Sequence, residues 1–195
     1  MFGHKKDINS FTLTTKIKLR HLSYEGFQYW ANMCYACARL YNVCVYNTYE
    51  LNKTKNTLFV QNDKDYLDIV KSNENYKFLP SAASINVLLS MQPMFKSFCM
   101  LLKAKKTGKY DKPVNPPSFK YKEGYTNFTV FNNGFSIKND KLCITPSFGK
   151  KANLKESDYC FDIPKYLLDR KIIMVTIKPS DEKNLKYFTL LITYS

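Results

Sequence analysis

The stretch that decides the fold is a single strand near the N-terminus, FTLTTKIKLR at residues 11–20. Apolar and polar side chains alternate along it over β-branched positions, which is typical of a strand with Lys16, Lys18 and Arg20 on one face. A lone strand leaves a row of unpaired backbone groups at its edge, so it needs a sheet to pair with. We therefore expect later parts of the chain to supply that sheet.

Helical periodicity begins directly after this strand. Ser23 is predicted to cap a helix that continues to about Leu51. A shorter helix with an acidic start is predicted over residues 62–72, where the helix dipole favours negative charge. Ser81 is then predicted to cap a long helix that ends at Gly108.

Short strands separated by Gly, Asn and Pro fill the end of the chain. The predicted strands are SFKYK, NFTVF, FSIKN, KLCITP, YCFDIP, KIIMVTIKP and KYFTLLITY, with tight turns at 132–134 and 138–140. This order predicts an α+β fold, in which an oligonucleotide-binding-like antiparallel β-barrel is interrupted after its first strand by a helical domain. The predicted parts are the first barrel strand at 1–21, the helical domain at 22–108 and the rest of the barrel at 109–195.

The chain is strongly basic. Its 195 residues carry 30 Lys and Arg against 16 Asp and Glu, a net charge of +14, and the excess is larger in residues 101–195 than in residues 1–100. With 45% apolar residues the chain can form a core, which excludes a disordered basic tail. Nucleic acid is the expected partner, because no stretch resembles the roughly 20 apolar residues of a membrane span. The N-terminus lacks the apolar segment of a secretory signal, so we expect a cytoplasmic, nucleoid-associated protein.

The sequence contains no complete motif that is typical of a catalytic or metal-binding site. The sequence has no phosphate-binding glycine loop, no paired carboxylates and no nucleophile beside a histidine base, so it predicts no catalytic centre in this chain. Cys34, Cys37 and Cys44 lie near one face of the first helix, and we interpret them as buried small apolar residues rather than metal ligands or a redox pair. The six cysteines form no repeated framework, which agrees with a reducing compartment. No metal and no cofactor is expected in this chain.

Lysine and aromatic residues alternate in FKYKEGY at residues 119–125. One interpretation is a half-buried strand whose lysines reach solvent. The other is a platform that binds phosphates and stacks bases on Tyr121 and Tyr125, as single-strand-binding barrels do. The two tyrosines alone do not decide between them.

Six motifs, in order, resemble parts of the N-terminal half of the transposon-encoded TnpB proteins and the related compact type V CRISPR effectors. The opening strand KIKLRHLS resembles their first barrel strand, and ARLYNVCVYNTYEL is similar to their Arg-Phe-Val-Tyr-Asn helix motif, with Tyr41 and Asn42 in place and Arg39 displaced by one. LPSAASINVLLSMQPMFKSF resembles a family helix that ends in Phe-Lys-Asn-Phe. PPSFKYK, KLCITPSFGK and the closing hairpin KIIMVTIKPSDEKNLKYFTLLITY also have counterparts in the family.

The resemblance implies a barrel and a helical recognition lobe that bind a guide RNA and the guide–target duplex. In the family, the early part of the capped helix and the loop before the second barrel strands recognise a short motif that flanks the target DNA. The corresponding residues here are Ser81, Ala82, Ser84, Ile85, Asn86, Asn132 and Asn133. The family has Gln at the position of Ile85, so neither the family's flanking sequence nor its recognition carries over directly to this chain. The residues expected to hold the RNA or DNA backbone are Lys16, Lys18, Arg20, Arg39, Lys103, Lys105, Lys106, Lys109, Lys120, Lys122, Lys150 and Lys151.

The family's RuvC-like nuclease follows the closing hairpin, whereas this sequence stops at Ser195. The leading hypothesis is a guide-RNA- and target-binding lobe that acts with a separate RuvC-bearing chain, in which case magnesium would belong to that partner. A second hypothesis is a nuclease-free, RNA-guided transcriptional regulator. The third is a basic structural RNA-binding protein without a defined guide.

Overall fold

Helices and antiparallel sheets together make up the computed structural model, which describes residues 11–56, 60, 62–146 and 154–195. The expected α+β class, with one strand, then helices, then strands, is confirmed. The strands are β1 (Leu13–Leu19), β2 (Phe128–Phe131), β3 (Phe135–Lys138), β4 (Lys141–Ile144), β5 (Cys160–Asp162), β6 (Ile172–Pro179) and β7 (Phe188–Tyr194). The helices are α1 (Tyr24–Lys55), α2 (Lys64–Ser72), α3 (Glu74–Phe78) and α4 (Ser81–Lys106), with 3₁₀ turns at Glu156–Asp158 and Lys165–Leu167.

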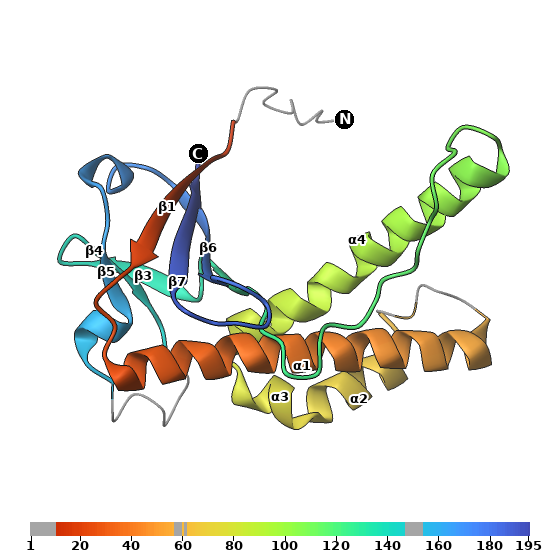
Figure 1. Cartoon of the computed structure of the whole chain (residues 1–195), viewed down its shortest axis with the longest axis horizontal. Coiled ribbons are helices and arrows are strands. Elements are labelled where there is room, and N and C mark those ends of the chain that lie inside the picture. Colours follow the sequence, from red (N-terminus) through yellow and green to blue (C-terminus); the bar gives the residue numbers. More distant parts are fainter. Residues whose placement is uncertain (1–10, 57–59, 61, 147–153) are drawn as a thin grey trace, which may run out of the picture.

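The first strand pairs with the last one (Figure 1). β1 runs antiparallel to β7, with Leu13 opposite Tyr194 and Leu19 opposite Phe188, and the four-stranded sheet has the order β1-β7-β6-β2. A second sheet has the order β3-β4-β5. The lone N-terminal strand thus pairs with the C-terminal part of the chain, and the helices are inserted between two strands of one sheet.

α1 begins where the sequence predicts. The Ser23 hydroxyl accepts a hydrogen bond from the Gly26 backbone N–H at 3.0 Å, which satisfies one of the free donors of the first turn. The helix continues past Leu51 to Lys55 and ends at Asn56, whose φ of 50° is left-handed. The turn at Asn139 and Asp140 has positive φ at both residues, as a tight hairpin turn requires.

One hydrophobic core joins α1 to the sheets. Trp30 is fully buried, and its ring lies edge-on to that of Phe128 of β2 at 5.4 Å between centroids. Val175 of β6 and Leu190 of β7 belong to the same buried cluster. The helical and β parts therefore stabilise each other through shared apolar burial.

A buried carboxylate fixes the start of α1 to the second half of the chain. Asp158 accepts hydrogen bonds from the Ser23 N–H (2.8 Å), the Ser23 hydroxyl (2.7 Å) and the Lys155 N–H (3.0 Å). The Trp30 indole N–H donates to the Asp158 carbonyl at 2.7 Å. A Cβ at Gly26 would overlap the Asp158 side chain, so this close approach requires glycine. We call Ser23, Gly26, Trp30 and Asp158 the α1 anchor.

Two local predictions are wrong. SFKYK, at residues 118–122, is not a strand: its backbone lies along α1 and bonds to helix side chains instead of a neighbouring strand. Ser81 is the first residue of α4 and not its cap. The cap residue is Pro80, which makes no side-chain capping bond and whose carbonyl accepts from Ala83 and Ser84.

Two cysteines are joined in a disulfide. Cys143 of β4 and Cys160 of β5 lie opposite each other, with their Cα atoms 4.0 Å apart. The two cysteines are 17 residues apart in the sequence, and no sequence pattern predicted that they pair. Disulfides are rare in reducing compartments, so this pair does not support the reducing environment expected from cysteine usage.

α4 projects away from both sheets (Figure 1). Within the described residues it is the one helix long and apolar enough to cross a membrane by length and composition, so the expectation that no segment qualifies is wrong by this measure. Val87, Met91 and Phe95 form its buried face, while Leu89 and Met100 are exposed. Pro93 lies inside the helix without ending it.

Candidate nucleic-acid interface

A cleft lies between the start of α4 and the β2–β3 turn. Its volume is about 340 Å³, and it is lined by Pro80, Ser81, Ala82, Asn133, Gly134, Thr145 and Pro146. The two sides are the segments that the resemblance assigns to recognition of the flanking motif, although some 50 residues separate them in the sequence. We call this the α4 cleft.

Gly134 sets the width of the α4 cleft. A Cβ at this residue would lie 2.5 Å from the Val130 Cβ, closer than packed carbon atoms allow, and 3.1 Å from the Ala82 Cβ, which is a tight contact. Backbone bonds hold the turn in place, since the Gly134 N–H donates to Phe131 at 2.8 Å and the Gly134 carbonyl accepts from Thr145 at 3.0 Å. Glycine at this residue therefore lets the turn lie tight against β2 and close to the start of α4.

The residues predicted to recognise the flanking motif do not all face the α4 cleft. Ser81 and Asn133 line it and are exposed. Ser84 is fully buried, and its hydroxyl donates to the Ser81 carbonyl at 3.2 Å, so its proposed contact with DNA is wrong. In the amide orientation that satisfies both of its polar atoms, Asn132 donates to the backbone of β6.

Ile85 and Asn86 lie one turn further along α4. Ile85 is 41% exposed and Asn86 is half-buried, and neither lines the cleft. The start of a helix carries partial positive charge, which favours an anionic ligand at Ser81 more than one at these later residues. The cleft thus offers three exposed polar side chains, Ser81, Asn133 and Thr145, from distant parts of the sequence.

A basic loop (residues 109–127) is fixed to α1 by the motif residues Tyr41 and Asn42. The Asn42 amide makes two bonds to Lys120: its Oδ1 accepts from the Lys120 N–H at 2.7 Å and its Nδ2 donates to the Lys120 carbonyl at 3.1 Å. The Tyr41 hydroxyl donates to the Ser118 carbonyl at 3.2 Å, and that of Tyr49 to Pro117 at 2.7 Å. These side chains replace the strand pairing that SFKYK lacks.

Arg39, which is predicted to contact the RNA or DNA backbone, is bonded to the basic loop and helps to position it. Its Nη2 donates to the Tyr121 carbonyl at 2.6 Å, and its guanidinium lies 4.8 Å from the Tyr35 ring centroid. Its Nε is buried and has no hydrogen-bond partner in the structure. The guanidinium therefore acts mainly within the chain.

The two tyrosines proposed to stack bases have different surroundings. Tyr121 is 55% exposed, and the Lys183 Nζ lies 3.8 Å from its ring centroid, so a ring with an adjacent cation is accessible. Tyr125 is half-buried, its ring is edge-on to that of Tyr35, and it packs against the core. Tyr121 is thus more accessible for base stacking than Tyr125, and stacking on either ring stays a prediction.

The predicted phosphate-binding lysines fall into separate groups. Lys103, Lys105, Lys106 and Lys109 are exposed at the end of α4 and just beyond it, and within the described residues no carboxylate lies within 4.0 Å of them. Lys120 is instead paired with Glu182 at 3.0 Å, next to the exposed Lys122. Lys150 and Lys151 lie outside the described residues.

Lys16, Lys18 and Arg20 are all exposed on β1 and directly after it, as the alternation predicts. Sequence reasoning missed Lys186 and Tyr187, which line a pocket together with Lys18 and Arg20. The register of β1 on β7 brings these residues together, and no local pattern could have revealed it. We call this pocket the β1/β7 pocket.

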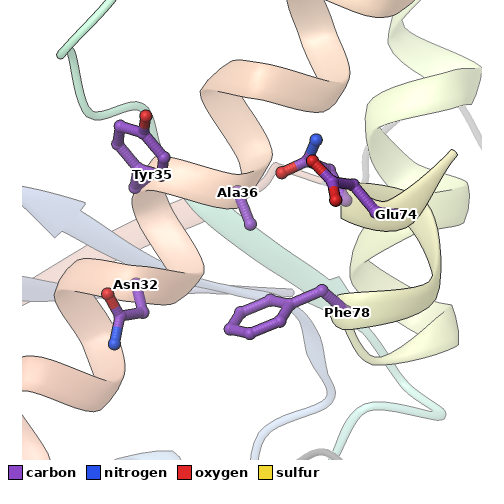
Figure 2. A pocket seen from close by; sticks show the side chains of 6 residues that line it. Asn32, Tyr35, Ala36, Glu74 and Phe78 are labelled. Carbon is purple, nitrogen blue, oxygen red and sulfur yellow. The ribbon is translucent and has the colours of Figure 1, made fainter.

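Figure 2 shows a groove between α1 and α3, which is lined by Asn32, Tyr35 and Ala36 of α1 and by Glu74 and Phe78 of α3. Its volume is about 370 Å³. Among the described residues that line it, the ionisable groups are the Tyr35 phenol and the Glu74 carboxyl, and none is a cation. A polyanion is therefore poorly suited to this groove.

The cysteines of α1 are buried, as predicted. Burial raises the pKa of the Cys34 thiol to about 12 and that of Cys44 to about 11, and it raises that of Cys37 well above its usual value. Protonated thiols are poor nucleophiles and poor metal ligands. Within the described parts of the chain, no three His, Cys, Asp or Glu residues are grouped to hold a metal ion.

No protein-family model matches the chain, and no curated protein is significantly similar to it in sequence. The resemblance to the TnpB family therefore rests on the six sequence motifs.

Proposed function

We propose that this chain is a guide-RNA-binding and target-DNA-recognition lobe of a TnpB-like effector, which acts with a separate chain that carries the nuclease. The observation that carries the proposal is the α4 cleft, where two segments expected to recognise the flanking motif come together. The pairing of β1 with β7 around inserted helices also agrees with the family's arrangement, and we propose that the two sheets form its oligonucleotide-binding-like barrel.

The distribution of charge supports binding of a long polyanion. Exposed cations without carboxylate partners lie on β1 and at the end of α4, at two ends of the described structure. Nearly all of them are lysines, which contact phosphates as point charges and carry little base specificity. We assign sequence recognition of the flanking DNA to Ser81 and Asn133, and recognition of the guide sequence to base pairing.

The test begins with the protein purified from its native host. RNA bound to it is sequenced, and copurifying proteins are identified by mass spectrometry. A defined guide RNA together with a RuvC-bearing chain supports the effector, whereas a defined guide RNA without that chain favours the nuclease-free regulator. Heterogeneous RNA without a defined guide would overturn the proposal in favour of a structural RNA-binding protein.

A second experiment tests the α4 cleft directly. Binding of the RNA-loaded protein to target DNAs with a randomised flanking motif is compared for Asn133→Ala and for the control Asn127→Ala, which changes an exposed asparagine outside the cleft. We expect Asn133→Ala to lose discrimination among flanking sequences and Asn127→Ala to retain it. If both variants discriminate equally well among flanking sequences, the α4 cleft does not recognise the flanking motif.

A further inference from the structure

The β1/β7 pocket lies where β1 ends, β7 begins and α1 starts. It is lined by Lys18, Leu19, Arg20, Leu22, Phe27, Lys186 and Tyr187, and its volume is about 340 Å³. Leu19 is opposite Phe188, so the residues just beyond each strand end, Arg20 and Tyr187, enter the same pocket. This volume is large enough for a nucleotide-sized group.

Three cations and no carboxylate line this pocket. Lys18, Arg20 and Lys186 are exposed, and within the described residues none of them has a carboxylate oxygen within 4.0 Å. Some lysines elsewhere in the chain are paired, as Lys55 is with Asp63 at 2.6 Å. Like charges gathered without counter-charges attract an anion to the space between them.

An aromatic ring lies beside these cations. The Lys18 Nζ is 3.8 Å from the ring centroid of Tyr187, so a cation–π contact holds the ammonium at the pocket. The ring is still 38% exposed. A cationic pocket next to an accessible ring has the chemistry that binds one phosphate and stacks the adjoining base.

We propose that the β1/β7 pocket binds a phosphate of single-stranded RNA through Lys18, Arg20 and Lys186, while the neighbouring base stacks on Tyr187. This inference rests on the proposed function and adds to it a defined contact for the guide RNA. A single strand fits better than a duplex because a paired base is already stacked on its neighbours and cannot lie on the tyrosine ring.

The test measures the affinity of the full chain for a ten-nucleotide oligouridine RNA by fluorescence anisotropy at several salt concentrations. The pocket variant combines Lys18→Gln, Arg20→Gln and Lys186→Gln. Its control combines Lys64→Gln, Lys71→Gln and Lys77→Gln on α2 and α3, which removes the same charge from exposed residues elsewhere. Tyr187→Ala is compared with Tyr187→Phe, and circular dichroism checks that each variant is folded.

We expect the pocket variant to reduce the slope of log affinity against log salt by about 0.7 for each phosphate that the protein no longer binds, with a smaller change in the control. Tyr187→Ala should weaken binding about 5- to 150-fold, as removal of one stacked base does, and Tyr187→Phe should bind like the wild type. Oligouridines with a 5′-phosphate and with a 5′-hydroxyl distinguish a terminal phosphate from an internal one. Both effects should vanish with an RNA duplex of the same length.

Equal reductions in affinity for the pocket variant and its control, or equal binding by Tyr187→Ala and Tyr187→Phe, would overturn the pocket while leaving the proposed function intact. Wild-type protein that binds no RNA would overturn both. If the variants lose as much affinity for the duplex as for the single strand, the proposed contact is wrong and the lysines only attract the phosphate backbone.

Discussion

Replacement of Asp158 by Ala should strongly destabilise the protein. The side chain is fully buried and accepts three hydrogen bonds, two from Ser23 and one from the Lys155 N–H. A hydrogen bond to a charged group contributes roughly 1.5 to 3 kcal/mol, and a buried donor left without a partner costs about 1 to 3 kcal/mol. The bonds share one acceptor group, and desolvation of the carboxylate offsets part of their gain. We therefore expect a decrease of about 3 to 4 kcal/mol in the free energy of unfolding.

The assay is urea unfolding followed by tryptophan fluorescence. Trp30 is the single tryptophan of the chain, is fully buried and donates to the Asp158 carbonyl, so its emission reports directly on the α1 anchor. Far-UV circular dichroism provides an independent transition. For a chain of this size, each kcal/mol lowers the melting temperature by roughly 2 to 4 °C, so a fall of about 10 °C is expected.

The matched control is Asp162→Ala. This carboxylate is exposed and makes one ion pair, with Lys141 at 3.4 Å, so its removal should change stability by less than about 0.5 kcal/mol. Gly26→Ala should destabilise the protein as well, because the added Cβ meets the Asp158 side chain. The double variant should lose less unfolding free energy than the two single variants lose together, since both substitutions disturb the same contact. A decrease below about 1 kcal/mol for Asp158→Ala would refute the reasoning.

Three further predictions concern other sites. Gly134→Ala should weaken binding of target DNA more than binding of RNA, because the new Cβ pushes the β2–β3 turn away through Val130; gel shifts measure both. Asn42→Ala should release the basic loop and speed tryptic cleavage after Lys120, because it removes two hydrogen bonds. Stability should fall as the pH rises above 9. Burial raises the pKa of the Cys34 thiol from its usual 9.0 to about 12, so between pH 9 and pH 12 this thiol loses its proton only in the unfolded chain. The fall is about 1.4 kcal/mol per pH unit for this thiol, measured by urea unfolding.

Each of these predictions has its own control. Asn47→Ala removes an amide of α1 that bonds only within the helix, and it should leave the cleavage rate unchanged. Cys34→Ala should reduce the alkaline slope, whereas Cys99→Ala, which changes a partly exposed thiol, should not. An equal decrease in RNA and DNA binding by Gly134→Ala would argue that the turn supports the whole fold and not the α4 cleft alone.

Local sequence signals predicted most of the elements correctly. The alternation in residues 11–20, the Ser23 cap and the turn at 138–140 each depend on residues a few positions apart, and all three are present in the structure. SFKYK has the same alternation but is not a strand. Its hydrogen-bonding partner is Asn42, 78 residues away, and no local pattern records such a contact.

The candidate sites divide in the same way. Sequence indicated the excess of cations and the two segments of the α4 cleft, because charge and motif order are properties of the chain itself. It could not indicate that Arg39 is bonded to the basic loop, that Ser84 faces inward, or that Lys186 joins Lys18 in one pocket. Each of these depends on what lies beside the side chain after folding.

The sequence by itself determined the class of fold, the order of its elements and a strongly basic surface, since periodicity and charge are local or additive quantities. Only the tertiary structure decided which cations remain free and which are paired. It also decided that Asp158, an ordinary acidic residue in the sequence, is a buried acceptor for α1. The physical reason is that a polar group's role depends on the partners and the solvent around it, and those are brought together by strand register and packing across more than 100 residues.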